Sequence, residues 1–180
     1  DCTLLLDLIK RSIGSEIAKV KVIYFREIDP FPEIESFVLD CAKFYGVTIK
    51  SVETNDSIKN ILRNICDDDK SLKSCFMGSR KTDPGCSTSK SFEPTDKGWP
   101  ELMRVNPILD WSCENVWEYL LNNQVPYCSL YDLGYTSIGN KHNTDPNPHL
   151  KIDGNETKYR PAYELKDDTL ERAGRSKLQM

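Results

Sequence analysis

The stretch that decides the fold is residues 3–25, which read TLLLDLIKRSIGSEIAKVKVIYF. Its first part, residues 3–13, is apolar on most faces and stops at Gly14, which is typical of a helix that packs against a sheet and ends on a glycine. Residues 20–25 are β-branched and aromatic, so they predict a strand. A buried helix that leads into a strand indicates a layered α/β fold.

The same alternation continues along the next 50 residues. Apolar residues recur at helical spacing between Pro32 and Gly46, and a later helix begins behind Asp56 as its expected N-cap. In order, the pattern predicts a helix over 34–45, a strand over 47–52, a helix over 58–66 and a strand over 74–77. Alternating helices and strands predict a doubly wound, mainly parallel sheet with helices on both faces.

The second half of the chain has fewer periodic segments. Residues 79–110 contain four prolines and many polar residues, so we expect a structured loop there. A helix is predicted over 113–123 behind Ser112, and a short one near 164–172. Ligands of doubly wound sheets bind at the carboxyl ends of the strands, which here follow Phe25, Val52 and Met77.

Length and charge exclude several classes of protein. The chain has 180 residues, 38% of them hydrophobic, which suits one domain over residues 1–180. No apolar stretch approaches the roughly 20 residues of a membrane span. The net charge of −4 supplies no global positive field, so neither a nucleic acid nor a membrane is an expected partner. The sequence does not decide the oligomeric state, for which a monomer is the expectation.

The cysteines point to a reducing compartment. They are seven in number and contain no C-x-x-C pair, which disfavours a zinc ribbon or a redox dithiol. Several replace apolar residues in helical patterns, as reduced cysteines do, and no secretory signal is present. We therefore expect a cytoplasmic protein. The cysteines are Cys2, Cys41, Cys66, Cys75, Cys86, Cys113 and Cys128.

One candidate site follows the strand predicted over 74–77. Gly78 would let the backbone approach a ligand closely, Arg80 offers a planar fork to phosphate oxygens, and Asp83 is a hard ligand suited to Mg²⁺ beside a phosphate. The alternative is a turn in which Arg80 and Lys81 are solvated.

Two further segments carry possible ligand groups. Trp99 and Arg104 lie in a proline-bounded loop, where a ring and a guanidinium could hold a planar charged ligand, or could only cover the core edge. Arg172 and Arg175 lie one helical turn apart and could clamp a phosphate, or could offset their acidic neighbours on a solvated face. His142 and His149 are weak evidence for a metal site.

Together these segments resemble the eukaryotic-type FAD synthases, which are FMN adenylyltransferases of the PAPS-reductase-like branch of the adenine nucleotide α-hydrolase fold. Asp1-Cys2-Thr3 resembles the end of that family's phosphate loop, which implies that the first strand and most of the loop precede Asp1. The other matching motifs are FMGSRKTDP at 76–84, PTDKGWPELMRVNPILDW at 94–111, PYCSLYDLGYTSIGN at 126–140, NPHL at 147–150 and DDTLERAGR at 167–175.

The resemblance implies a reaction of FMN with ATP, in the presence of Mg²⁺, that gives FAD and pyrophosphate. It implies catalytic roles for Asp83, Arg172 and Arg175, with Asp83 also orienting the metal. It further implies contacts to FMN by Asp96, Trp99 and Arg104. The residues implied for ATP are Asp1, Cys2, Thr3, Phe25, Arg26, Gly78 and Arg80.

Two alternatives remain open. A PAPS or adenylyl-sulfate reductase on the same fold would need a reactive cysteine near its C-terminus, and the last cysteine here is Cys128. A tRNA-thiolating relative would show paired cysteines or a basic face, and neither is present. A nucleotide-binding or flavin-binding module without catalytic activity is compatible with the sequence.

Overall fold

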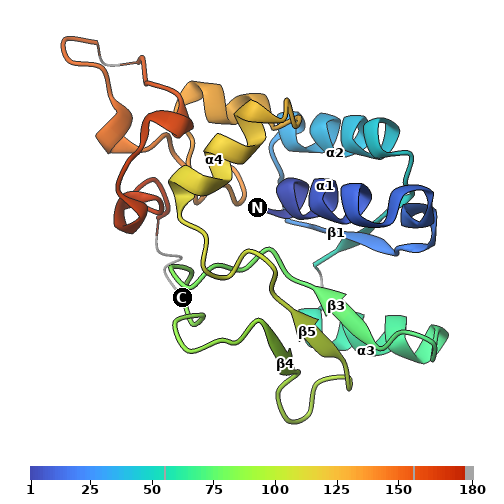
Figure 1. Cartoon of the computed structure of the whole chain (residues 1–180). Coiled ribbons are helices and arrows are strands. Elements are labelled where there is room, and N and C mark those ends of the chain that lie inside the picture. Colours follow the sequence, from blue (N-terminus) through green and yellow to red (C-terminus); the bar gives the residue numbers. More distant parts are fainter. Residues whose placement is uncertain (55, 156, 177–180) are drawn as a thin grey trace.

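The predicted alternation of helices and strands is confirmed. The computed structural model describes residues 1–54, 56–155 and 157–176. Over the described residues no helix is both long and apolar enough to cross a membrane. The first six elements are α1 (Cys2–Ile13), β1 (Val22–Arg26), α2 (Pro32–Tyr45), β2 (Ile49–Glu53), α3 (Ile58–Asp68) and β3 (Ser74–Phe76), which run from blue to green in Figure 1.

The strands form two ladders in place of the single sheet that the pattern predicts. β1 pairs with β2 in parallel, and β3 pairs in parallel with β5 (Met103–Val105). β5 also pairs with β4 (Phe92–Pro94), and that pair is antiparallel. The expectation of a loop over 79–110 is therefore wrong for β4 and β5, because strands of three residues are too short to show a period of two.

The helices begin and end at capping residues, which differ from the predicted ones at one position. Gly46 ends α2 in the left-handed region at φ 64°, as the sequence indicates. The expected N-cap Asp56 is wrong by one residue, because Ser57 accepts the hydrogen bond from the amide of Asn60 at 3.3 Å. Asp56 instead accepts from the amide of Ser57 at 2.6 Å. α4 (Cys113–Asn122) begins behind Ser112, as predicted.

The helix expected over 164–172 is absent from the described chain. The structure has two short 3₁₀ turns there, Ala162–Glu164 and Asp168–Leu170. Asp167 accepts hydrogen bonds from the amide and the hydroxyl of Thr169, at 2.9 and 2.6 Å. Such local bonds compete with the helical ladder, which explains the correction.

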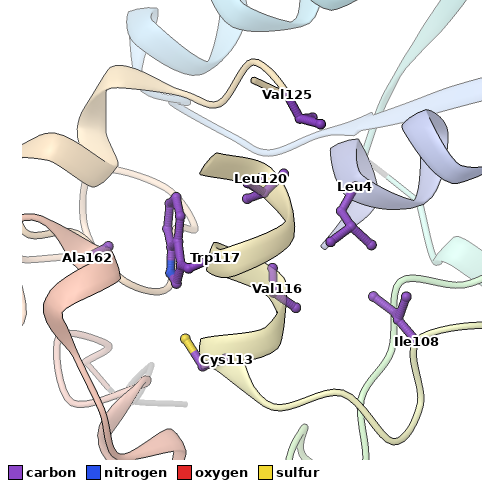
Figure 2. Close-up of a cluster of buried hydrophobic side chains, with 8 residues drawn as sticks. All are labelled: Leu4, Ile108, Cys113, Val116, Trp117, Leu120, Val125 and Ala162. Atoms are coloured by element: carbon purple, nitrogen blue, oxygen red, sulfur yellow. The ribbon is translucent and has the colours of Figure 1, made fainter. Parts of the chain in front are cut away.

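The main core joins α1 to α4. Trp117 lies at its centre, with the rings of Tyr127, Tyr131 and Tyr163 packed edge-on at 5.2 to 5.9 Å between centroids. Leu4 of α1 packs into the same cluster and is fully buried (Figure 2). Its buried members are Leu4, Ile108, Cys113, Val116, Trp117, Leu120, Val125 and Ala162. This packing sets the beginnings of α1 and α4 near each other.

A buried carboxylate reinforces that arrangement. Asp7 of α1 is 5% exposed and accepts hydrogen bonds from the hydroxyls of Tyr45 on α2 and Tyr119 on α4, at 3.2 and 2.8 Å. Arg11 pairs with it at 2.6 Å. Burial, together with the nearby Asp7 carboxylate, raises the pKa of Tyr45. Asp7 therefore links three helices through one side chain.

We expect Asp7→Ala to lower the free energy of unfolding by about 2–4 kcal/mol, because it leaves two tyrosine hydroxyls without their acceptor. Urea denaturation measures the loss. Asp40→Ala is the control, since the one ion pair of Asp40 in the described chain is with Lys43, at 3.9 Å on an exposed face of α2. It should cost less than about 0.5 kcal/mol. Equal losses in the two variants would contradict the role of Asp7.

Candidate functional site

A cavity of about 280 Å³ opens where the N-terminus of α1, the start of α4 and the C-terminal segment meet. One part of its wall is apolar and includes Phe37, Val116, Trp117, Leu120, Cys128 and Tyr131. The other part is polar and includes Asp1, Thr3, Arg80, Asp83, Glu171 and Arg172. The cavity therefore suits a ligand that is both apolar and charged.

The loop after β3 reaches this cavity through its backbone. The amide of Met77 donates to the carbonyl of Val105 at 2.9 Å, and that of Lys81 donates to Leu109 at 2.8 Å. Gly78 lies against the start of α1, where a Cβ would come 3.2 Å from the amide nitrogen of Cys2. The close approach expected of Gly78 is thus to the chain itself, and it brings Arg80 next to α1.

Arg80 is the central charge of the site. Its side chain is only 1% exposed and lies among three carboxylates. Its Nη2 pairs with Glu171, its Nε lies 3.3 Å from Asp1, and its Nη1 lies 3.9 Å from Asp168. The alternative that Arg80 is solvated is therefore wrong.

Two donors of this guanidinium remain unused. Within the described residues, Nε and Nη1 of Arg80 have no hydrogen-bond partner although both atoms are buried. A buried donor without an acceptor costs about 1–3 kcal/mol, and more when it is charged. An oxyanion in the cavity would remove that cost, so Arg80 favours an anionic ligand.

Asp83 belongs to the same turn. Its Oδ2 accepts from the amide of Arg80 at 2.8 Å, and its own amide donates to the carbonyl of Arg80 at 3.0 Å. The interpretation as a turn is correct for Asp83 and also for Lys81, which is exposed and pairs with Asp110 at 2.5 Å. Asp83 nonetheless lies on the cavity wall, as does Arg80, whose Nε and Nη1 have no hydrogen-bond acceptor in the described chain.

The carboxylate of Asp83 suits a cation whose other ligands are the phosphates of a bound substrate and water. No group of three or more His, Cys, Asp or Glu residues that could hold a metal occurs in the described part of the chain. Mg²⁺ is commonly bound by one or two carboxylates together with waters and substrate phosphates. Asp83 fits that mode. Of the two histidines, His142 pairs with Asp29 at 3.0 Å.

The C-terminal segment is fastened to the cavity by groups that sequence analysis missed. Asp168 accepts two hydrogen bonds from the amide of Cys113 at the start of α4, at 2.9 and 3.0 Å. Asn147 is fully buried and donates to the carbonyl of Leu170 at 2.8 Å. Asp168 and Glu171 thus do not lie on a solvated face, whereas Asp167 is exposed. Their partners are distant in sequence, so no local pattern indicates them.

Arg172 lies on the cavity wall and Arg175 lies beyond it. Nη1 of Arg172 donates to the hydroxyl of Ser137 at 3.3 Å. Nε of Arg175 is buried and has no hydrogen-bond partner among the described residues. Burial lowers the pKa of Arg175, and the like charge of Arg172 lowers it further. The structure therefore keeps two arginines near one end of the cavity.

The residues implied for the adenine side do not line the cavity. Phe25 and Arg26 lie at the end of β1, and Arg26 pairs with Glu35 at 2.8 Å and with Glu53 at 3.5 Å. The hydrogen bonds from Arg26 lower the pKa of Glu35. Their contact with ATP stays a prediction.

The three residues implied for FMN lie together, away from the cavity wall. Arg104 on β5 approaches Asp96 at 3.3 Å and Glu93 at 3.5 Å, and it also donates to the carbonyl of Pro94. Trp99 is 36% exposed, and its amide donates to the carbonyl of Asp96 at 3.0 Å. Arg63 of α3 holds the same turn through the carbonyl of Gly98. Asp96 therefore links the turn that carries Trp99 to Arg104, and the contact of these residues with FMN stays a prediction.

Comparison with known proteins agrees with this arrangement. A family model described as a phosphoadenosine phosphosulfate reductase domain matches residues 68–146. The probable FAD synthase of Schizosaccharomyces pombe is 40% identical over 93% of this chain and 62% of its own length. Candida glabrata FMN adenylyltransferase in complex with ATP superposes with a TM-score of 0.86 at 27% identity, over 97% of this chain and 75% of that one. The same enzyme in complex with FAD and inorganic pyrophosphate gives a TM-score of 0.79 at 27% identity, over 85% and 65%.

The chain is thus similar in sequence and in fold to FAD synthases.

These similarities confirm the resemblance that the motifs indicate, together with the α/β fold class. The chain spans 62% of the length of the S. pombe relative that it matches. The reductase domain model that matches residues 68–146 includes β3, β5 and α4, which are the elements around Arg80. The loop after β3 thus lies within the part of the chain that is similar to the reductase domain.

We expect Arg80→Met to lower the free energy of unfolding by about 3 kcal/mol, because it leaves a group of partly buried carboxylates without a cation. Lys81→Met is the matched control, since Lys81 is the next residue and its ion pair is exposed. It should cost less than about 1 kcal/mol. Chemical denaturation of both variants measures the difference, and a stable Arg80→Met protein would show that the cluster is not held by this charge.

Proposed function

We propose that the protein transfers the AMP moiety of ATP to FMN, giving FAD and pyrophosphate. The observation that carries this proposal is Arg80, a buried guanidinium with two unused donors in a cavity shared with Arg172 and Asp83. Such a site is suited to oxyanions, and both substrates are phosphate esters. The 40% identity to a probable FAD synthase supports the choice of substrates.

The chemistry requires positioning and charge neutralisation. An oxygen of the FMN phosphate attacks the α-phosphorus of ATP in line, a new P–O bond forms, and the bond to the β-phosphate oxygen breaks as pyrophosphate leaves. No general base is needed, because a phosphate monoester is already ionised at neutral pH. Arg80, Arg172 and Arg175 would spread the charge that develops on the phosphate oxygens.

The start of α1 is suited to the phosphates of ATP. Asp1 makes no side-chain capping hydrogen bond in the first turn, so the amides of Cys2 and Thr3 keep their capacity to donate. Helix N-termini bind phosphate through such amides and through the helix dipole. We assign Asp1, Cys2, Thr3, Gly78 and Arg80 to the phosphate side of the ATP site, with Phe25 and Arg26 toward its adenine.

We propose Mg²⁺ as the metal of the reaction. Asp83 would hold it, with the remaining ligands coming from substrate phosphates and water. Bound there, Mg²⁺ would neutralise charge on the phosphates. The hydrogen bond from the Arg80 amide keeps one oxygen of Asp83 in place, so the carboxylate is directed by the turn that also presents Arg80.

FMN is assigned to the cluster formed by Asp96, Trp99 and Arg104. Trp99 offers a partly exposed ring for stacking, and Arg104 is a cation held by acidic side chains on two sides. The phosphate of FMN would then extend toward the end of the cavity that carries the two C-terminal arginines. This placement lets one substrate connect two groups of residues that are separate in the structure.

The domain itself is assigned to residues 1–180, with one further strand in the sheet. Within the described chain, β1 pairs only with β2, and β3 pairs only with β5, which leaves one edge of each strand open. A parallel strand leading into the phosphate loop before α1 would join the two ladders. We also propose the cytoplasm as its compartment, since Cys41, Cys113 and Cys128 are buried as free thiols.

A reductase activity is disfavoured by the state of the last cysteine. Cys128 is 1% exposed, and burial raises the pKa of its thiol, which is the opposite of what a nucleophilic thiolate needs. A binding module without catalysis is the second candidate. It would occupy the same cavity, so turnover is the measurement that distinguishes the two.

Full-length protein incubated with ATP, FMN and Mg²⁺ should form FAD and pyrophosphate in equal amounts, measured by chromatography and a phosphate-release assay. EDTA should abolish the reaction. Tight binding of FMN or ATP with no FAD formed would instead support the binding module.

Asp83→Asn should lower kcat by about 100-fold with little change in stability, because the amide oxygen still accepts from the Arg80 backbone but the charge on the metal side is lost. Asp110→Asn is the control, since Asp110 is exposed and, within the described residues, pairs only with Lys81. Steady-state kinetics over a range of Mg²⁺ concentrations tests the assignment. Unchanged kcat and unchanged Mg²⁺ dependence in Asp83→Asn would remove Asp83 from the site.

A further inference from the structure

The guanidinium of Arg175 lies against a glycine in the loop that forms part of the cavity wall. A Cβ built on Gly139 would come 2.4 Å from Nη2 and 2.6 Å from Cζ of Arg175. Side-chain carbons do not approach other heavy atoms so closely. Gly139 follows Ile138, which lines the cavity. The guanidinium thus occupies the space that a side chain at position 139 would take.

The backbone of Gly139 does not itself require glycine. Gly134 in the same loop has φ 84°, in the region that other residues avoid, whereas Gly139 lies outside that region. Any residue could therefore adopt the backbone of Gly139. The need for glycine comes from the space that Arg175 fills together with Oδ1 of Asn143.

The same loop also holds the backbone of Arg175. Thr144 and Arg175 form an antiparallel bridge, and the amide of Asp145 donates to the carbonyl of Gly174 at 2.9 Å. Gly174 permits this approach, because a Cβ there would lie 2.2 Å from the carbonyl oxygen of Asp145. Loop residues 139–145 therefore fix both ends of the Arg175 side chain.

Without a bound anion, the position of the Arg175 guanidinium is electrostatically unfavourable. Arg172 carries the same charge nearby, and burial and this repulsion together lower the pKa of Arg175, against a smaller opposite effect of Glu27. Nε of Arg175 also lacks an acceptor in the described chain. A free side chain would move outward to water, so its position has to be enforced by its surroundings.

We propose that Gly139 is a positioning residue for Arg175. By lacking a side chain, it leaves the space that holds the guanidinium beside Arg172, where the two arginines together can bind the phosphates of the substrates. The assignment of phosphate as the anion rests on the proposed function. Gly139 contacts no substrate and acts only through Arg175.

The test is a set of double-mutant cycles on the full-length protein. Gly139→Ala should lower kcat for FAD formation about tenfold, with a smaller change in KM for ATP, because the guanidinium must move although it is still present. In an Arg175→Ala background the same change should cost less than about twofold. In an Arg172→Ala background it should keep its tenfold effect. Additive losses with Arg175→Ala would overturn the proposal.

Affinity for inorganic pyrophosphate gives a second readout that needs no turnover. Calorimetry should show the same pattern, with Gly139→Ala weakening pyrophosphate binding in the Arg172→Ala protein but not in the Arg175→Ala protein. If the wild-type protein forms no FAD but shows this pattern, the proposed reaction fails and the role of Gly139 is supported. Equal weakening in both backgrounds would overturn that role.

Stability provides the remaining arm. A Cβ at position 139 would also lie 2.6 Å from Oδ1 of Asn143, so Gly139→Ala is expected to lower Tm. If Arg175 fills the space, the loss of Tm should be smaller once Arg175 is truncated. Recovery of folding in Gly139→Ala/Arg175→Ala would support the proposal even if Gly139→Ala alone does not fold. An equally large loss of Tm on Gly139→Ala in the wild-type and the Arg175→Ala proteins would contradict it.

Discussion

One buried guanidinium connects the parts of this molecule that meet at the cavity. Arg80 comes from the loop after β3, and its acidic neighbours come from the start of α1 and from the C-terminal segment. A charge that is almost fully buried is stable only when opposite charges and hydrogen bonds surround it. Those three segments must therefore pack at fixed positions around Arg80, and the cavity is the space left between them.

Contacts behind the Arg80 cluster also hold α1 and α4 in fixed positions. Asp7 joins α1 to α2 and α4, and the apolar cluster around Trp117 fills the space between α1 and α4. Asp168 then caps the beginning of α4 through the amide of Cys113. Local positive potential at helix starts and at buried arginines would allow a chain with a net charge of −4 to attract the phosphate esters of the proposed reaction.

Hydrophobic periodicity predicted the elements that are long enough to show it. The alternation from α1 to β3 and the capping of α4 by Ser112 could be predicted because spacing and caps are local properties. β4 and β5 were missed because each has three residues, and the expected helix near 164–172 was wrong because Asp167 bonds to Thr169 in preference to a helical turn. Short elements depend on their neighbours more than on their own pattern.

Local sequence patterns indicated the order of helices and strands, the resemblance to FAD synthases, and most of the polar residues that reach the cavity. Only the tertiary structure decided which charges meet. Arg80 and Glu171 pair across 91 positions, and the guanidinium of Arg175 lies in the space beside Gly139. Periodicity and capping act over a few residues, whereas such pairings depend on how distant segments pack. For that reason Glu171, Asn147 and Gly139, although they lie in motifs of the resemblance, have no local pattern that indicates their contacts.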